Sequence, residues 1–442
     1  MSLLGGSAGS PSAKHTRRRL CASLILACAC GAATAHASPA DLYGFGPRPQ
    51  SMAGAGAAVA SGFSSTYANP ALLGLEHGRS LSLGYQAGTF SLYAEGPNAS
   101  RPPPQEGMQG TFIGVVLPLP FGGVLEDRLT LGLGTYTPTD LIARARLLYP
   151  ERTQFPLLTD RAQTLNFNLG MGVDLGSGFQ VGAGFLALAE LVGTVVVQTD
   201  TSGRVGTTVD DQLVATYAPI LGVAYRHDDT KAGLTWRGAL EGDFDVIVEV
   251  NDLGSLVVPD LNIAGVAQYD PMTLQAEVAQ SFGSTTLVGG ATWRHWSAFD
   301  GFARPTVRCP ATQPDCEALT PAAVEFADVV VPRLGVMHEL GLSSSARSEL
   351  RAGYAFEPSP LGEQTTALNL LDNDRHVLAL GYGVELRDPL PPINLDVFWQ
   401  LHWLAPRTHQ KDASVAADNP GAPHVKSGGT LQNFGLICGV QF

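Results

Sequence analysis

The chain has 442 residues, of which only 15% are charged and 51 are glycines. Soluble domains average about 25% charged residues and about 7% glycine, so this composition is atypical of them. The formal net charge of −13 argues against nucleic-acid binding, which needs a basic surface. Beyond the N-terminus no apolar run reaches the length of about 18 residues that a membrane-spanning helix needs. A sparsely charged chain without such runs fits a membrane β-barrel, whose apolar residues occupy alternate positions.

The first 37 residues have the pattern of an export signal. Arg17–Arg19 form a basic region, Leu20–Ala33 is an apolar stretch too short to span a bilayer, and Ala35–Ala37 is a small-residue cleavage site. We expect residues 1–37 to be removed; an N-terminal anchor, through the apolar stretch or a lipidated cysteine, is the alternative. The signal contains four of the 27 Lys and Arg and no acidic residue. The rest of the chain therefore has 23 Lys and Arg and 40 Asp and Glu, which is a net charge of −17.

Residues 38–78 show no strand pattern and form the next predicted unit. They contain Tyr43 and Phe45, then a stretch rich in glycine and alanine, then the turn-forming residues Asn69-Pro70-Ala71. Small residues allow one backbone to pass close to another. We expect a compact irregular segment that precedes a barrel domain at residues 79–442, and a disordered leader is the alternative.

Alternation of apolar and polar residues predicts β-strands from residue 79 onward. The clearest case is Leu165–Leu175, where apolar side chains on one face alternate with Asn, Gly and Asp on the other. Gly176–Gly178 then supplies a tight turn into a return strand that begins at Phe179. Further alternating segments are Arg79–Gln86, Leu129–Tyr136, Leu221–Arg226, Ala232–Arg237, Leu378–Leu386 and Leu395–Trp403. A soluble β-sandwich also alternates, and it is the alternative fold at this point.

The lengths of the connections give the predicted strands an orientation. Turns such as Gly176–Gly178 and His227–Thr230 are short, whereas other connections are long and rich in Pro, Asp and Thr. Outer-membrane barrels have short periplasmic turns and long extracellular loops. The strand count is fifteen if Leu261–Phe282 holds two strands broken at Asp270-Pro271. A single bent strand there would give fourteen, an even number of the kind that such barrels have.

The end of the chain favours the membrane barrel over the soluble sandwich. Apolar side chains at Phe434, Leu436, Cys438 and Val440 alternate with small or polar residues up to the terminal Phe442. This pattern predicts a closing barrel strand. An aromatic terminal residue on such a strand resembles the signal that the outer-membrane barrel-assembly machinery recognises. We therefore expect a barrel that is assembled by this machinery and faces outer-membrane lipid.

Cysteines and histidines predict no metal or cofactor site. Cys309 and Cys316 lie in a proline-rich exported loop, where the oxidising compartment favours a disulfide over a zinc site. Four histidines lie on strand-like segments without a spacing that predicts a nucleophile and its base, namely His295, His338, His376 and His402. We therefore predict no metal, no cofactor and no enzymatic activity. An outer-membrane lipid-modifying enzyme is kept as the less favoured alternative.

Several motifs resemble the FadL family of outer-membrane long-chain fatty-acid transporters. Tyr67-Ala68-Asn69-Pro70-Ala71, which follows a glycine- and alanine-rich start, resembles the Asn-Pro-Ala motif of the family's N-terminal hatch. Three segments resemble the family's paired strands around a Ser-Pro loop, namely Leu350–Tyr354, Pro358–Pro360 and Asp372–Arg375. Trp293–Ser297 resembles the Trp-Ser end of an upstream strand, while residues 88–211 carry no matching motif.

This resemblance implies a monomeric fourteen-stranded barrel whose lumen is blocked by residues 38–78 as a hatch. In such transporters extracellular loops capture a hydrophobic molecule, an internal apolar pocket holds it, and a gap at a kinked strand releases it sideways. The hatch or gating residues would be Tyr43, Phe45, Asn69, Pro70 and Ala71. Candidates for the weak strand are Gly132, Gly134 and Pro138, because glycine relaxes a strand and proline cannot donate to its ladder.

The sequence does not select the ligand among fatty acids, aromatic hydrocarbons and other lipophiles, all of which proteins of this kind handle. A general diffusion porin is the main alternative function. Residues Tyr43–Leu72 argue against it, because a porin has an open polar lumen without a hatch.

Overall fold

The computed structural model describes residues 40–99, 107–123, 126–139, 152–160, 165–199, 205–251, 260–301, 303–308, 324–343, 345–387 and 391–442. The chain divides into two compact units, Met1–Thr34 and Ala35–Phe442, and only the second contains described residues. None of the described helices is long and apolar enough to cross a membrane. The predicted export signal lies outside the described residues.

Fourteen antiparallel strands close into a ring, which confirms the predicted membrane barrel and its strand number. β1 pairs with β2 on one edge and with β17 on the other, so the ring has no free sheet edge at this junction. In ring order the strands are β1 (Ser80–Glu95), β2 (Met108–Pro118), β3 (Leu129–Pro138), β4 (Asn166–Gly176), β5 (Phe179–Thr199), β6 (Val205–His227), β7 (Thr230–Arg237), β10 (Met272–Phe282), β11 (Thr285–His295), β13 (Val329–Ser343), β14 (Ala346–Glu357), β15 (Arg375–Leu386), β16 (Ile393–Gln410) and β17 (His424–Gln441).

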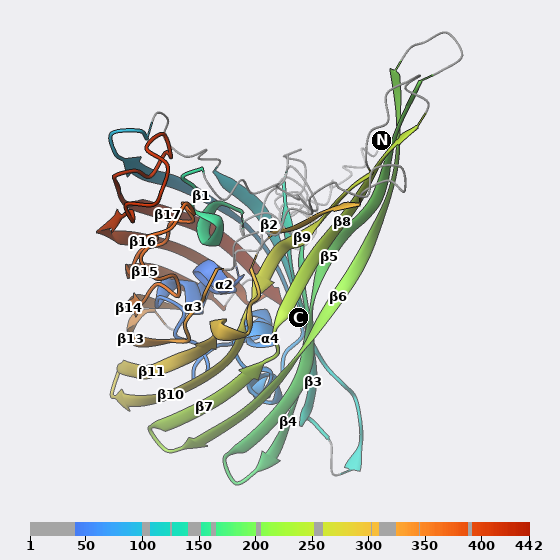
Figure 1. Cartoon of the computed structure of the whole chain (residues 1–442). Helices are drawn as coiled ribbons and strands as arrows, with labels where there is room; N and C mark the ends of the chain where they lie inside the picture. The colour runs from blue at the N-terminus through green and yellow to red at the C-terminus, as the bar shows by residue number, and fades with distance from the viewer. Residues whose placement is uncertain are drawn as a thin grey trace, which may run out of the picture. The chain divides into compact units, whose positions relative to one another are not determined.

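Three further strands lie outside the ring: β8 (Leu240–Asn251), β9 (Asp260–Asp270) and β12 (Ala303–Arg308). β8 pairs in parallel with the part of β5 that extends beyond β4, and β9 pairs with β8 (Figure 1). β12 pairs with β9. Residues 261–282 therefore form two strands divided at Pro271, which cannot donate a backbone hydrogen bond. The alternative of one bent strand is wrong. The ring still has an even number of strands, because β9 is not one of its members.

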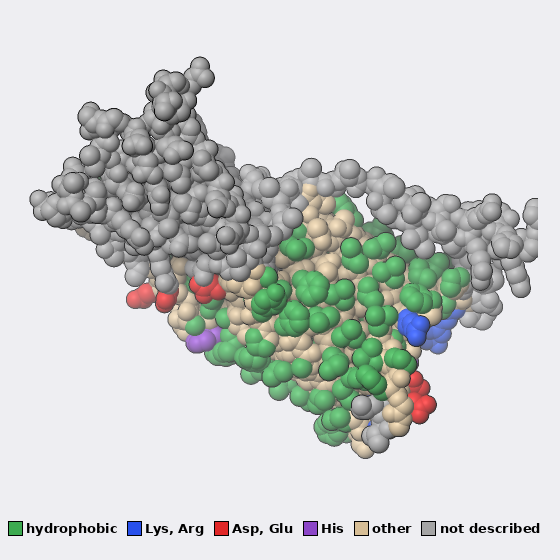
Figure 2. All heavy atoms as spheres, turned by 90° about the vertical axis from the view of Figure 1, so that its right-hand side faces the viewer, with side chains coloured by type: hydrophobic (Ala, Val, Ile, Leu, Met, Phe, Trp, Pro, Cys, Tyr) green, Lys and Arg blue, Asp and Glu red, His purple; other side chains and the backbone are tan. Residues whose placement is uncertain are grey.

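The alternation places apolar side chains on the outside of the barrel. In β4, Asn166 and Asn168 are buried inside, whereas Met171 is 43% exposed on the outer face. Exposed large apolar side chains recur around the ring, among them Leu221, Leu234, Val278, Leu287, Leu334, Leu378 and Leu395. Figure 2 shows such side chains spread over one face, with charged side chains at the margins of the described surface. A soluble sandwich buries its apolar face, so this arrangement fits contact with lipid.

The C-terminal strand closes the ring. Phe434, Leu436 and Val440 lie on the outer face of β17, and Ile437 faces inward and is buried. Phe442 follows the strand with 72% of its surface exposed, and its amide donates to the Arg79 carbonyl. The predicted closing strand is therefore present, and recognition of Phe442 by the assembly machinery stays a prediction.

The N-terminal segment, Ala40–Glu76, lies within the ring as a series of short helical turns (Figure 1). Its elements are α2 (Ala40–Tyr43), α3 (Pro47–Ser51), η1 (Gly62–Ser64), α4 (Ser65–Ala68) and η2 (Pro70–Leu75). η2 contacts β3 to β6, and α3 contacts β14 to β17. Short turns leave many backbone amides and carbonyls without a helical partner, so the inner wall has to supply partners for them.

Candidate functional site in the barrel interior

Asn69 joins three parts of the interior. Its Oδ1 accepts a hydrogen bond from the Ala71 amide at 3.1 Å, and its Nδ2 donates to the Ala57 carbonyl at 2.7 Å and to the Val223 carbonyl of β6 at 3.1 Å. Pro70 follows at the first position of η2, where a helix needs no amide donor. The Asn-Pro-Ala turn therefore fixes η2 to a neighbouring loop and to the barrel wall. Asn69, Pro70 and Ala71 are all buried.

Glycines line the wall where the N-terminal segment approaches β2 to β7. A Cβ atom on Gly222 would overlap Asn69 Oδ1, and one on Gly233 would overlap the Ala57 carbonyl oxygen. Gly172 of β4, Gly182 of β5 and Gly222 of β6 are consecutive partners across the sheet. Similar close approaches occur at Gly114, Gly132, Gly134, Gly353 and Gly381. The high glycine content thus arises in part because the backbone of the N-terminal segment packs closely against these strands.

An aromatic cluster accompanies the glycines on this side. The ring centroid of Phe45 lies 5.6 Å from that of Phe63 and 5.4 Å from that of Phe112 in β2, and Phe112 lies 5.1 Å from Tyr136 in β3. All four rings are buried. Contacts of this kind add to the stabilisation from apolar burial, but they are neither hydrogen bonds nor ion pairs. The segment is therefore held here by shape and apolar contact.

Polar side chains dominate the opposite wall, from β7 to β16. They donate to backbone carbonyls of the segment: Arg237 to Tyr67, Gln275 to Gly54, Arg333 to Ala53, Thr235 to Ala68, and Gln400 to Tyr43 and Gln50, all between 2.6 and 3.1 Å. Glu277 of β10 acts in the reverse sense, because it accepts from the amides of Gly56 at 3.1 Å and Ala58 at 3.2 Å. This wall thus supplies the partners that the irregular backbone lacks.

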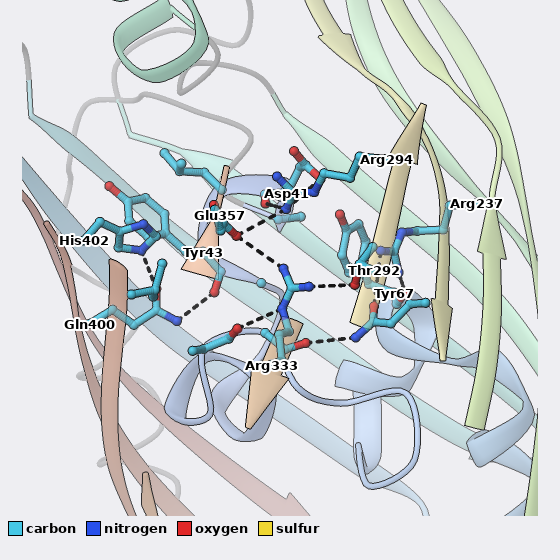
Figure 3. A pocket seen from close by; sticks show the side chains of 17 residues that line it. Asp41, Tyr43, Tyr67, Arg237, Thr292, Arg294, Arg333, Glu357, Gln400 and His402 are labelled. Carbon is cyan, nitrogen blue, oxygen red and sulfur yellow. Dashed lines mark hydrogen bonds and ion pairs between the residues drawn. The ribbon is translucent and has the colours of Figure 1, made fainter. Parts of the chain in front are cut away.

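Glu357 of β14 is the centre of a buried charge cluster (Figure 3). Its carboxylate lies 3.5 Å from Arg294, 3.3 Å from Arg333 and 2.8 Å from Arg375. Arg294 also donates to the Asp41 carbonyl of α2 at 3.3 Å. Removal of one partner of a buried ion pair leaves an uncompensated charge and is strongly unfavourable. Glu357 therefore positions two arginines that hold the N-terminal segment.

Little free space remains at this level. The cavity that Asp41, Tyr43, Tyr67, Arg333 and Glu357 help to line has a volume of about 30 Å³, room for one or two water molecules. Tyr43 packs edge-on against His402 with ring centroids 5.1 Å apart. Burial raises the pKa of the Tyr43 and Tyr67 hydroxyls well above the usual value, so both stay neutral.

The structure places two of the three predicted weak-strand residues, Gly132 and Gly134, against the N-terminal segment. A side chain on Gly132 would meet Leu73 and Thr66, and one on Gly134 would meet Phe45. Pro138 is the last residue of β3 and is paired with Gly110. The pairing of β3 with β2 and β4 is regular around these residues. A lateral opening at this strand stays a prediction.

Other predicted residues lie away from the interior. Cys309 and Cys316 fall outside the described residues, so their disulfide stays a prediction, and Cys438 is half-buried on β17. His295 has Asp328 at 3.1 Å and Ser297 at 3.3 Å, but both contact the same ring nitrogen, Nδ1. A catalytic triad needs the two partners on opposite nitrogens. The described residues contain no cluster of metal-ligating side chains.

Sequence reasoning missed the residues that hold the segment most firmly. Glu277, Arg294, Arg333, Glu357 and Gln400 all occupy inward positions of alternating strands. Charged residues on the inner face of a strand were a signal that could have drawn attention to them. Their partners are backbone atoms of a distant, irregular segment, which no strand pattern reveals.

A closed barrel with an apolar outer face and a segment packed in its lumen has the architecture of an outer-membrane barrel protein. The family model described as "Outer membrane protein transport protein (OMPP1/FadL/TodX)" matches residues 28–441. The chain therefore belongs to the FadL/TodX family of outer-membrane transporters of hydrophobic compounds, and not to a class of enzymes.

Solved structures with the same fold are distant in sequence. A FadL homologue of Pseudomonas aeruginosa is 13% identical with a TM-score of 0.60, over 90% of this chain and 98% of that one. The toluene transporter TodX of P. putida is 14% identical with a TM-score of 0.53, over 91% and 99%. The CymD monoaromatic hydrocarbon channel is 15% identical with a TM-score of 0.54, over 90% and 97%. No curated protein matches the chain by direct sequence comparison.

Proposed function

We propose that the chain carries long-chain fatty acids or other small hydrophobic compounds across the outer membrane, with the N-terminal segment as a movable hatch. The observation that carries this proposal is that the lumen is filled at the level of Glu357. The segment fits a glycine wall on one side, is hydrogen-bonded to a polar wall on the other, and leaves a cavity of about 30 Å³ near Glu357. A diffusion porin keeps a water-filled channel instead. Cargo therefore passes only when the segment shifts.

Two clusters of buried apolar side chains favour an oily cargo. One cluster runs from Phe45 and Phe112 to Leu404 and Leu431 of the wall. A second lies at the extracellular ends of β11 and β13 and at the C-terminal end of β9, where Tyr269 and Phe299 stack at 4.3 Å beside Trp296 and Phe326. Removal of an oily molecule from water onto such surfaces is favourable. We assign loop capture to the second cluster and internal holding to the first.

The similar structures suggest the classes of cargo to test. One is a toluene transporter and another a monoaromatic hydrocarbon channel. We therefore propose alkylbenzenes beside long-chain fatty acids as substrates. For release we propose a sideways exit at β3, where movement of Phe45 and Leu73 away from Gly134 and Gly132 would leave the wall without an inner lining.

The test replaces Asn69 and Pro70 together by alanine. Uptake of a labelled long-chain fatty acid and a labelled alkylbenzene is measured in cells that lack other such transporters, and single-channel conductance is measured in planar bilayers. The parent should conduct ions poorly yet take up cargo. The variant should lose most uptake while its heat-modifiable folded barrel is retained, because Asn69 no longer joins η2 to Ala57 and Val223.

A matched control replaces Pro97 and Asn98, the same residue types in an extracellular turn, where Asn98 donates to the Ala417 carbonyl. This variant should behave like the parent. A large steady conductance of the parent, with no uptake of hydrophobic cargo above that of cells without the protein, would contradict transport and favour a porin.

A further inference from the structure

Two buried asparagines on the inner face of β4 have amide atoms without hydrogen-bond partners among the described residues. Asn168 has no exposed surface, and Asn166 is 1% exposed. In the described part of the chain, nothing bonds to Nδ2 or Oδ1 of Asn168 or to Oδ1 of Asn166. A buried amide without a partner is unfavourable, because it has lost its hydrogen bonds to water. The two amides are therefore available to a polar group that enters the lumen.

The positions of the two asparagines allow them to bind one group together. They are two residues apart on a regular strand, so their side chains leave the same face about 7 Å apart. A small polar group between them can accept a hydrogen bond from one amide and donate one to the other.

The neighbours of the two amides across the sheet are apolar or aromatic. Asn166 lies opposite Tyr136 of β3, and Asn168 lies opposite Gly134 of β3 and Leu186 of β5. Tyr136 and Leu186 belong to the apolar cluster to which we assign internal holding of the cargo. A hydrocarbon held by this cluster therefore brings its polar end close to the amides.

The N-terminal segment covers the wall beside Asn168. A Cβ atom on Gly134 would lie 2.6 Å from Phe45. One on Gly170, the next inward residue of β4, would lie 3.3 Å from Leu73 and 3.5 Å from Thr66. Displacement of the segment, which the proposed function requires, therefore uncovers this part of the wall.

The charge of the inner wall differs between its two sides and selects the chemistry of the ligand. The inward residues described in β3 to β6 are uncharged except Asp174 and Arg226, which lie at the periplasmic ends. The buried arginines lie on the opposite wall, namely Arg237, Arg294, Arg333, Arg351 and Arg375. A carboxylate pairs best with arginine, whereas a neutral hydroxyl pairs well with amides.

We propose that Asn166 and Asn168 bind the hydroxyl group of a hydrophobic cargo, as in an alkylphenol or a long-chain alcohol. The hydroxyl accepts from Asn168 Nδ2 and donates to Asn166 Oδ1, and the apolar cluster holds the hydrocarbon part. This inference rests on the proposed transport function and specifies the class of cargo that the site prefers.

Two cargoes that differ only in the hydroxyl test the proposal. Initial uptake of labelled octylphenol and labelled octylbenzene is measured at limiting concentration in cells that lack other such transporters, with cells without the protein as background. Asn168→Leu keeps the size of the side chain and removes the amide. It should lower the ratio of the octylphenol rate to the octylbenzene rate at least fivefold, and Asn166→Leu should lower it at least twofold. The control Asn394→Leu changes an inward asparagine at the periplasmic end of β16 and should leave the ratio unchanged.

Thermal stability separates binding from a structural role. Removal of an unpaired buried amide should leave the temperature at which the heat-modifiable barrel is lost equal to or above that of the parent. An unchanged ratio in both leucine variants would overturn the hydroxyl site, and so would an equal loss of both cargoes in a less stable barrel. Absence of octylphenol, octylbenzene and fatty-acid uptake by the parent would instead refute transport itself.

Discussion

The two halves of the inner wall hold the same segment by different means. From β2 to Gly233 of β7 the wall presents glycine and aromatic rings, and side-chain bonds to the segment are few. From β7 to β16 it presents arginine, glutamine and glutamate, which bond to backbone atoms of Asp41 to Tyr67. Glycine contacts also occur on that side, as at Gly353 against Met52. The glycine wall sets how closely the segment fits, and the polar wall sets how firmly it is held.

This difference predicts how each half responds to substitution. A steric fit fails when one atom is added, because backbone cannot move aside as a flexible side chain can. A network of buried bonds fails when one partner is removed, because the others lose their compensation. Substitutions in the glycine half therefore test the steric fit of the segment, and substitutions in the polar half test the buried bonds that hold it.

The largest effect is expected in the polar half, from Glu357→Gln. The neutral amide leaves Arg294, Arg333 and Arg375 without their shared carboxylate. Loss of one partner of a buried ion pair costs about 3–5 kcal/mol, so the hatch should loosen. Single-channel conductance should rise clearly above that of the parent. The control Glu385→Gln removes the partly exposed partner of Arg387 and should leave conductance unchanged. Equal conductance of Glu357→Gln and the parent would contradict the claim that the polar half holds the segment in place.

A smaller effect is expected in the glycine half, from Gly233→Val. The new side chain would overlap the Ala57 carbonyl, so the loop at Ala57 must shift at a cost of about 1–3 kcal/mol. Gly289→Val is the matched control, because its Cβ would face only Leu334 at 3.6 Å. We expect Gly233→Val to lower the temperature at which the heat-modifiable barrel is lost, and Gly289→Val to leave it unchanged. Identical behaviour of the two variants would argue against a close glycine fit.

The smallest effect is expected from Thr235→Val, on β7 where the two halves meet. The change keeps the shape and removes one hydrogen bond, from Thr235 Oγ1 to the Ala68 carbonyl at 2.7 Å. Such a loss costs about 1 kcal/mol. Uptake and conductance should both stay near parental values, with a slight loss of thermal stability. A large rise in conductance would show that the hold of the polar half is cooperative and not a sum of separate bonds.

The sequence predicts the barrel far better than its interior. The alternation at Leu165–Leu175 and the pattern before Phe442 report which face of a strand meets lipid, and both lie in regular strands of the ring. Asn69 was identified through a motif, and its three bonds account for the motif's composition. Glu357 and Glu277 were not identified, because their partners come together only in the closed ring. Pairing between positions hundreds of residues apart leaves no local pattern.

Displacement of the N-terminal segment during transport is the central claim, and a covalent restraint between the segment and the wall tests it most directly. A Cβ on Gly335 of β13 would lie 3.3 Å from the Cβ of Met52, near the separation of about 3.5–4.5 Å that a disulfide needs. Uptake of a labelled fatty acid and a labelled alkylbenzene is measured for Met52→Cys with Gly335→Cys, in a background with Cys309, Cys316 and Cys438 replaced by serine. We predict that oxidation abolishes uptake, that dithiothreitol restores it, and that Met52→Cys alone responds to neither treatment. Undiminished uptake by the fully oxidised pair would contradict the account.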